Sequence, residues 1–248
     1  MKQEITLPTE DGDARAFVFT PDSGAGPWPA AIIAMDAPAI RPAMFEMGER
    51  LAQAGYYVLL PDLFWRAGPY DPPNIAAARA GDPEAVAVFQ KLRGSTGVDK
   101  QMTDIKACLD YLARDPRAKA DKVGITGYCM GGSIALRAAG TFPDQIAAAA
   151  SFHGGGMATD HEKSPHLLAP QIKAKVLVAG ADEDASYDPA QNERLKATLA
   201  NAGVDADVSI WAGCKHGWVP TDMAVYNKDG AERHWRELVA LFDETLKA

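Results

Sequence analysis

Short apolar runs alternate with helix-like stretches along most of the chain. Strands are predicted by the apolar runs at residues 30–35, 56–60, 123–126, 146–152, 176–179 and 208–211. Helices are predicted by apolar periodicity and boundary residues at 43–54, 102–113, 133–139, 189–202 and 231–246. Residues 5–7 and 16–20, joined by a turn at 11–13, predict an antiparallel hairpin. Because strand and helix alternate, we expect an α/β fold with a mostly parallel central sheet and helices on both faces.

One stretch breaks this alternation. Residues 64–97 are rich in Pro, Gly and Ala, and we interpret them as an excursion over the sheet edge with short helices. We expect residues 1–248 to form one domain, since α/β enzymes of this length often do. In such folds the chemistry lies beyond the carboxyl ends of the strands, so the loops that follow the strands are the places to search.

The loop after the strand at 123–126 has the pattern of a nucleophile elbow. It reads Gly127-Tyr128-Cys129-Met130-Gly131-Gly132, with a glycine two residues before and two after Cys129. Such glycines let a strand and a helix approach closely around a strained turn. The first amides of the following helix favour a thiolate, and the Met130 amide can donate to an oxyanion. We predict that Cys129 is a nucleophile rather than a small buried side chain.

The other two cysteines are weaker candidates. Cys108 lies inside a predicted helix and is expected in the core, and Cys214 lies in a loop with no helix N-terminus behind it. Three cysteines in a chain of this length do not suggest a disulfide framework and fit a reducing cytosol.

A catalytic histidine should follow the last strand, because this kind of fold orders its residues as nucleophile, acid, histidine. His216 occupies that position. His153 follows a strand as well, but it precedes the expected acid, so we assign it to the pocket or to a structural role. The histidines and cysteines do not fall at zinc-ligand spacings, and we expect neither a metal nor a cofactor.

The acid should lie in the loop after the strand at 176–179, which holds four acidic residues. One carboxylate must accept the Nδ1–H of the histidine and so fix its tautomer. We place Asp184 ahead of Asp182 for this role and expect Asp188 to cap the next helix.

Composition and charge exclude several classes of partner. Of the 248 residues, 47% are hydrophobic, which is enough for a sizeable core. The formal net charge of -8 disfavours nucleic acid and anionic membranes. We see no signal peptide, and no apolar run approaches the about 20 residues that span a bilayer. We expect a cytoplasmic monomer or small homo-oligomer that acts on a small molecule.

Together these residues resemble the dienelactone hydrolase family of the α/β-hydrolase superfamily. The resemblance spans nearly the whole chain and is carried by Met35-Asp36, Gly55-Tyr56-Tyr57-Val58, Leu60-Pro61-Asp62-Leu63-Phe64, the Cys129 elbow and the loops of Asp184 and His216. It implies hydrolysis of an enol-lactone, the dienelactone 4-carboxymethylenebut-2-en-4-olide, to maleylacetate in aromatic degradation. It also implies an acidic residue, usually Glu, that contacts the resting thiol; Asp36 holds that place, one methylene shorter.

One departure from the family pattern concerns the substrate carboxylate. Relatives that bind it often carry Arg four residues after the histidine, where this chain has Pro220. The charge could instead come from Arg41, Arg66 or Lys215. We also expect Arg41, His153 and Trp218 around the pocket.

The expected reaction is nucleophilic. Cys129 attacks a lactone or ester carbonyl, the amides of Met130 and Ala37 hold the oxyanion, and His216, held by Asp184, activates water to hydrolyse the thioester. Two alternatives stay open. One is a general carboxylesterase or thioesterase for neutral esters, which Pro220 favours. The other is a non-enzymatic thiol-sensing or binding protein, since a fold alone does not establish activity.

Overall fold

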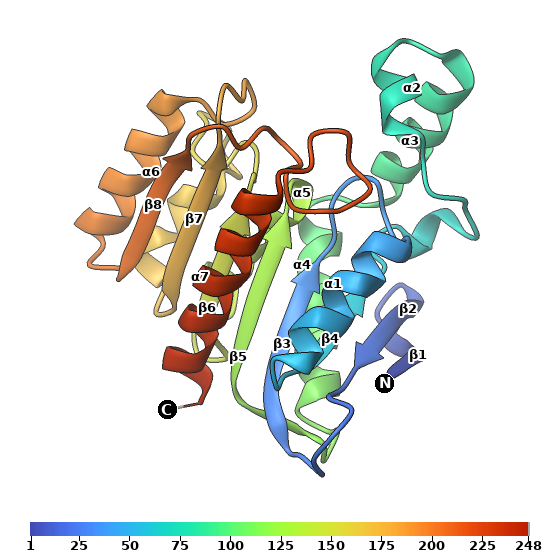
Figure 1. Cartoon of the computed structure of the whole chain (residues 1–248), viewed down its shortest axis with the longest axis vertical. Coiled ribbons are helices and arrows are strands. Elements are labelled where there is room, and N and C mark those ends of the chain that lie inside the picture. The colour runs from blue at the N-terminus through green and yellow to red at the C-terminus, as the bar shows by residue number, and fades with distance from the viewer. Residues whose placement is uncertain (248) are drawn as a thin grey trace.

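Eight strands form one mixed sheet in the computed structural model, which describes residues 1–247 (Figure 1). Their spatial order is β1-β2-β4-β3-β5-β6-β7-β8. β2 is antiparallel to both of its neighbours, and every pair from β4 to β8 is parallel. The strands are β1 (Lys2–Thr9), β2 (Gly12–Phe19), β3 (Trp28–Ala34), β4 (Tyr57–Pro61), β5 (Ala118–Tyr128), β6 (Ile146–Phe152), β7 (Lys175–Ala181) and β8 (Ala206–Trp211).

The central strands are continuously apolar because both of their faces are covered. Every residue of β4 is buried, and so is β3 from Ala30 to Ala34. The predicted hairpin is confirmed, with Ile5 paired to Ala16, but both of its strands are longer than expected. Lys2, Gln3 and Glu4 extend β1 beyond the expected start, and all three are exposed, so no apolar pattern marks this end of the strand.

Helices cover both faces of the sheet, as predicted. α1 (Pro42–Gln53) and α7 (Lys228–Leu246) lie in front of the sheet in Figure 1, and α4 (Val98–Leu112) and α5 (Met130–Thr141) lie behind it. α6 (Pro189–Asn201) packs beside β8. The Asp188 side chain accepts a hydrogen bond from the Gln191 amide, which confirms the predicted helix cap.

The excursion between β4 and α4 projects from one end of the molecule (Figure 1). It contains η1 (Trp65–Ala67), α2 (Ile75–Arg79) and α3 (Pro83–Ser95). Asn74 and Asp82 cap α2 and α3, and a proline opens α3, so α3 reaches 13 residues and is longer than the short helices expected. Leu92 is the one residue of α3 classed as buried, so this hairpin of helices is loosely attached.

A 3₁₀ segment, η2 (Pro165–Gln171), follows β6 and was missed because its prolines give no helical periodicity. Within residues 1–247, no helix combines the length and the apolar content needed to cross a bilayer.

Candidate active site

Cys129 sits at a sharp turn between β5 and α5. Its backbone has φ 53° and ψ −115°, a conformation that a residue with a side chain rarely adopts. A Cβ added at Gly127 would lie 1.8 Å from the carbonyl oxygen of Gly131. A Cβ at Gly131 would lie 2.0 Å from that of Ala34. The two glycines therefore allow strand and helix to close around the thiol, which lies partly exposed at the rim of the sheet.

Two backbone amides beside the thiol have no acceptor among the described residues. They belong to Met130, the first residue of α5, and to Ala37, in the loop after β3. Both residues line the cavity into which Cys129 opens. Paired free amides of this kind can hold a negatively charged oxygen.

Asp184 and His216 are in direct contact although 32 residues separate them in the chain. Oδ2 of Asp184 lies 2.6 Å from Nδ1 of His216, and Oδ1 accepts from the amide and hydroxyl of Ser186 at 2.8 and 2.7 Å. Burial acts to raise the pKa of Asp184, but the hydrogen bonds from His216 and Ser186 outweigh it and lower that pKa to about 2. Asp184 is therefore a carboxylate that holds the imidazole in one orientation.

The imidazole of His216 also interacts with the thiol. Burial disfavours its cationic form, but the hydrogen bonds and negative charges of Asp184 and Cys129 outweigh burial and raise the pKa of His216 to about 10. An imidazolium beside a cysteine stabilises the thiolate in turn. Cys129, His216 and Asp184, far apart in sequence, thus converge in one row.

The rival acid, Asp182, serves another purpose. Its Oδ2 accepts a hydrogen bond from the Gly213 amide at 2.8 Å, which fastens the β7 loop to the β8 loop. The residue between the two aspartates, Glu183, has a φ of 53°, and the turn there sends Asp182 and Asp184 to different partners.

His153 lies directly behind Cys129. Its Nδ1 accepts the amide hydrogen of Cys129 at 3.0 Å, and its ring centroid lies 5.3 Å from that of His216. Because Nδ1 accepts, the proton must reside on Nε2, and the ring must be neutral. Burial, followed by the neighbouring His216, lowers the pKa of His153 well below its ordinary value, in agreement with that tautomer. Among the described residues, Nε2 has no hydrogen-bond partner.

The thiol opens into a cavity of about 1090 Å³. The excursion forms one wall of it through Ile75, Ala78, Val86, Phe89, Gln90 and Arg93. Among residues whose side chains are described, Arg93 is the one lysine or arginine in this lining. It forms no ion pair with another described residue, and its guanidinium lies 5.7 Å from the ring centroid of Phe89. Arg93 was not predicted from the sequence; its one signal is the four-residue spacing from Phe89 on a helix.

The cations considered from sequence are engaged elsewhere. Arg41 was expected in the pocket. Its guanidinium is instead buried between Asp36 and Asp222, and Arg41 is not among the residues that line the cavity. Arg66 binds Asp104 and Asp11, and Lys215 binds Glu183. None of these three is free to meet a substrate in this cavity.

Asp36 and Trp218, which were also expected at the pocket, contact other groups than those expected. Asp36 lines the cavity, but both of its oxygens accept from Arg41, at 2.6 and 3.0 Å, rather than from the thiol. Trp218 is fully buried and lies outside the lining; its ring packs 5.0 Å from that of His153. Trp218, in the loop after β8, therefore packs against His153 instead of lining the cavity.

Comparisons with known proteins agree with this fold. A family model described as "Dienelactone hydrolase family" matches residues 14–246. A Synechocystis protein named "Putative carboxymethylenebutenolidase" is 25% identical over 246 residues, which cover 98% of this chain and 96% of the relative. The crystal structure of "Putative Dienelactone Hydrolase" from Klebsiella pneumoniae has a TM-score of 0.85 at 24% identity and covers 98% of each chain. That of a dienelactone hydrolase from Anabaena variabilis has a TM-score of 0.63 at 18% identity and covers 99% of this chain and 98% of the other. The expected fold is confirmed.

Proposed function

The chain belongs to the dienelactone hydrolase family, a family of hydrolases, and from that premise we propose that it opens an enol-lactone or a related activated ester through Cys129, His216 and Asp184. The proposed substrate is the dienelactone, and the proposed product is maleylacetate. The observation that carries the proposal is the contact of Asp184 with His216, 2.6 Å long, next to a thiol that also interacts with His216. Packing alone would not require a carboxylate, an imidazole and a thiol in this order.

In the first step, the Cys129 thiolate attacks the lactone carbonyl carbon, and the carbonyl electrons move to the oxygen. The amides of Met130 and Ala37 receive that oxyanion, because both are free and both line the cavity. The ring C–O bond then breaks as the carbonyl re-forms, so the enolate leaves and a thioester remains on Cys129.

The second step uses the change of charge that the first step causes. The thiolate is one of the groups that raise the pKa of His216, and acylation removes its charge. His216 then gives up its proton to the departing enolate and becomes a neutral base. Held by Asp184, it takes a proton from water, which attacks the thioester and frees the product carboxylate.

Leaving-group chemistry limits the substrates. From a tetrahedral intermediate, a thiolate departs more readily than an amine, so amide substrates return to starting material. An enolate or phenolate departs as readily as the thiolate and needs little protonation. We therefore assign enol and aryl esters to this site and exclude peptides.

Arg93 is the proposed partner of a substrate carboxylate. It stands at the wall of the cavity without an ion pair among the described residues, whereas Asp36 and Asp184 are each occupied by a cation. An arginine can bind a carboxylate with two parallel hydrogen bonds. This assignment replaces the missing arginine at Pro220 with one from the excursion.

A neutral ester is the second candidate substrate. The wall contributed by Ile75, Val86 and Phe89 is apolar, and the site would accept an uncharged acyl group without using Arg93. Turnover of the dienelactone, compared with that of p-nitrophenyl acetate, separates the two: the first proposal expects the higher kcat/KM for the anionic lactone. A preference for the neutral ester would support the carboxylesterase.

The test of the mechanism is a rapid-mixing experiment with p-nitrophenyl acetate. We expect a burst of one p-nitrophenolate per chain, followed by slower steady turnover, and an acetyl group on Cys129 in the quenched protein. A reactive thiol without turnover, the behaviour of a sensor, would give the burst alone. The absence of any acetylated Cys129 would contradict the thioester route.

A further inference from the structure

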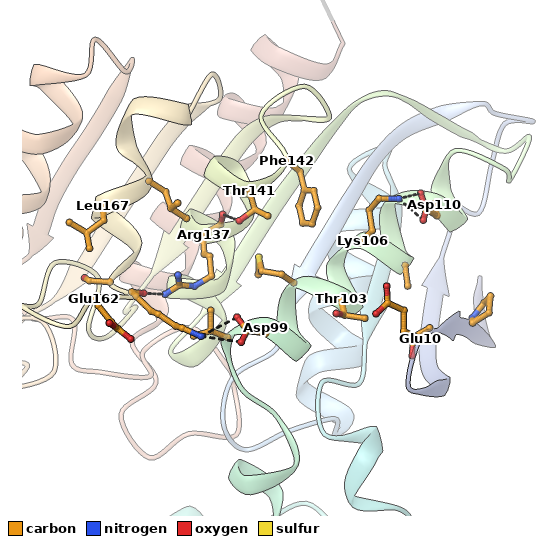
Figure 2. Close-up of a pocket in the computed structure, with 18 residues that line it drawn as sticks. Glu10, Asp99, Thr103, Lys106, Asp110, Arg137, Thr141, Phe142, Glu162 and Leu167 are labelled. Carbon is orange, nitrogen blue, oxygen red and sulfur yellow. Dashed lines mark hydrogen bonds and ion pairs between the residues drawn. The ribbon is translucent and has the colours of Figure 1, made fainter.

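A second cavity of about 1000 Å³ lies on the face of the sheet that carries α4 and α5. Figure 2 shows it in close-up, with side chains from both helices and from the segment before η2. It shares no lining residue with the catalytic cavity. We call it the α4–α5 groove; its lining includes Val98, Met102, Thr103, Arg137, Phe142 and Leu168.

Arg137 is the unusual member of this lining. Its side chain comes from α5 and is nine-tenths buried, with 9% of the residue exposed. Nη2 donates to the carbonyl oxygen of Lys163, and no described carboxylate pairs with the guanidinium (Figure 2). Burial lowers the pKa of Arg137, and only the charge of Asp99 opposes that effect.

Two other arginines with buried side chains are paired with carboxylates. Arg41 and Arg66 have only 6% and 9% of their side chains exposed, and each is held by two carboxylates. Removing a cation from water is costly unless an anion and hydrogen bonds replace the water. Arg137 is buried to the same degree without an anion, so its environment is complete only when one is supplied from outside.

The acidic residues of the groove do not supply that anion. Asp99 accepts from Lys163 at 3.0 and 3.3 Å, and Asp110 accepts from Lys106 at 2.6 Å through both oxygens (Figure 2). Glu10 and Glu162 are exposed to solvent. These carboxylates are therefore neutralised or hydrated, and the position beside Arg137 stays open.

Apolar side chains surround the guanidinium. Met102, Phe142 and Leu168 are at least partly buried in the lining, and Leu167 is 51% exposed at the surface. We propose that the α4–α5 groove binds an amphipathic organic carboxylate, with its anionic group on Arg137 and its apolar body along Met102 and Phe142. This inference is independent of the proposed catalytic function, because the groove and the thiol cavity are separate.

The test uses octanoate as the probe and octanamide as its uncharged match. Titration calorimetry should give measurable binding of octanoate and at least about tenfold weaker binding of octanamide, because a charge-assisted hydrogen bond contributes about a factor of ten or more. Arg137→Met, which keeps the apolar stem, should weaken octanoate binding by a similar factor. Arg137→Lys, which keeps the charge, should retain part of the affinity.

Arg93→Gln is the matched control, because octanoate could instead enter the catalytic cavity. The proposal expects Arg93→Gln to keep a binding component for octanoate that Arg137→Met lacks. If Arg93→Gln loses binding and Arg137→Met does not, or if octanamide binds as well as octanoate, the groove is not a carboxylate site.

A measurement on the unsubstituted chain covers the case in which Arg137→Met does not fold. Met102 lines the groove and Met223 lines the catalytic cavity, so their methyl signals in ¹³C-methyl-methionine NMR report on the two sites separately. Octanoate should shift the Met102 signal, whether or not Met223 also shifts through the catalytic cavity. Met102→Leu assigns the Met102 signal. A shift of Met223 alone, or of neither signal, overturns the proposal.

Discussion

The amide of Cys129 donates a hydrogen bond to Nδ1 of His153, with 3.0 Å between the two nitrogens. The nucleophile is thus held from its backbone as well as through its thiol. Both residues have positive φ angles, 53° for Cys129 and 42° for His153, so two strained turns support one another. His153 acts on Cys129 as a positioning residue rather than as a second base, because its Nδ1 lone pair is already used.

The first prediction follows from this contact. His153→Phe removes the acceptor and leaves the Cys129 amide unpaired, which costs about 1–3 kcal/mol and loosens the elbow. We expect kcat for p-nitrophenyl acetate to fall about tenfold or more with a smaller change in KM. His153→Asn offers an oxygen near the place of Nδ1 and tolerates positive φ, so it should retain most activity. Equal losses in the two variants would mean that His153 acts only by filling space.

The second prediction concerns the choice of thiol. Cys129→Ala should abolish turnover, since no other described cysteine is exposed at the cavity. Cys214 is 5% exposed and packs close to Gly230 and Trp218, and burial raises its pKa, so it is held as an unreactive thiol. Cys214→Ala should keep most of the activity in the same assay. Similar losses for the two variants would show that the wrong thiol has been assigned.

The third prediction separates the two aspartates by activity. Asp184→Asn removes the acceptor that orients His216 and should lower kcat by about a hundredfold or more. Asp182→Asn weakens only the contact with the Gly213 amide and should leave kcat within a few-fold of the unsubstituted value. The reverse ranking would contradict the assignment.

The fourth prediction concerns stability at acid pH. The folded-state pKa of Asp184, about 2, lies below its ordinary value of 3.8. A depressed folded pKa gives stability that is present above pH 3.8 and is lost as the pH falls toward 2. The full effect is about 2 kcal/mol, and about half of it should disappear between pH 5 and pH 3. In urea unfolding, the free energy of unfolding of Asp184→Asn should fall less between pH 5 and pH 3 than that of the unsubstituted chain. An equal fall in both proteins would contradict the pairing of Asp184 with His216.

The fifth prediction concerns Arg93. Arg93→Gln should raise KM for the anionic dienelactone about tenfold and leave p-nitrophenyl acetate kinetics unchanged, because only the first substrate carries a carboxylate. Arg114→Gln, which changes an exposed arginine outside the cavity, is the control for net charge. An equal rise in KM for Arg93→Gln and Arg114→Gln would mean that Arg93 acts only through the net charge of the protein.

Much of the architecture was predictable because it depends on local pattern. The buried strands β3 and β4 are apolar without interruption, and the elbow around Cys129 needs glycines at fixed spacing. The convergence of Cys129 with His216 follows from parallel strands ending at one rim, which fold class alone implies. Chain order therefore located His216 and the loop that holds Asp184.

The remaining features depend on contacts that no local pattern contains. Asp182 and Asp184 are separated by the positive φ of Glu183, which residue type does not favour. Arg41 meets Asp222 from 181 residues away, so a sequence reading could not tell that this cation was already paired. Arg93 belongs to a loosely packed excursion whose path depends on its caps and prolines rather than on apolar periodicity.

The most direct test of the proposed catalytic unit is the rate at which iodoacetamide alkylates Cys129 across pH. Asp184 and Cys129 raise the pKa of His216 to about 10, so an imidazolium lies beside the sulfur and should favour its attack on iodoacetamide. We predict that His216→Asn slows alkylation at pH 6.5 by about tenfold or more. The two rates should converge above about pH 10, where His216 loses its proton. Equal rates at pH 6.5, with Cys129 confirmed as the modified residue, would contradict the coupling of Cys129 and His216.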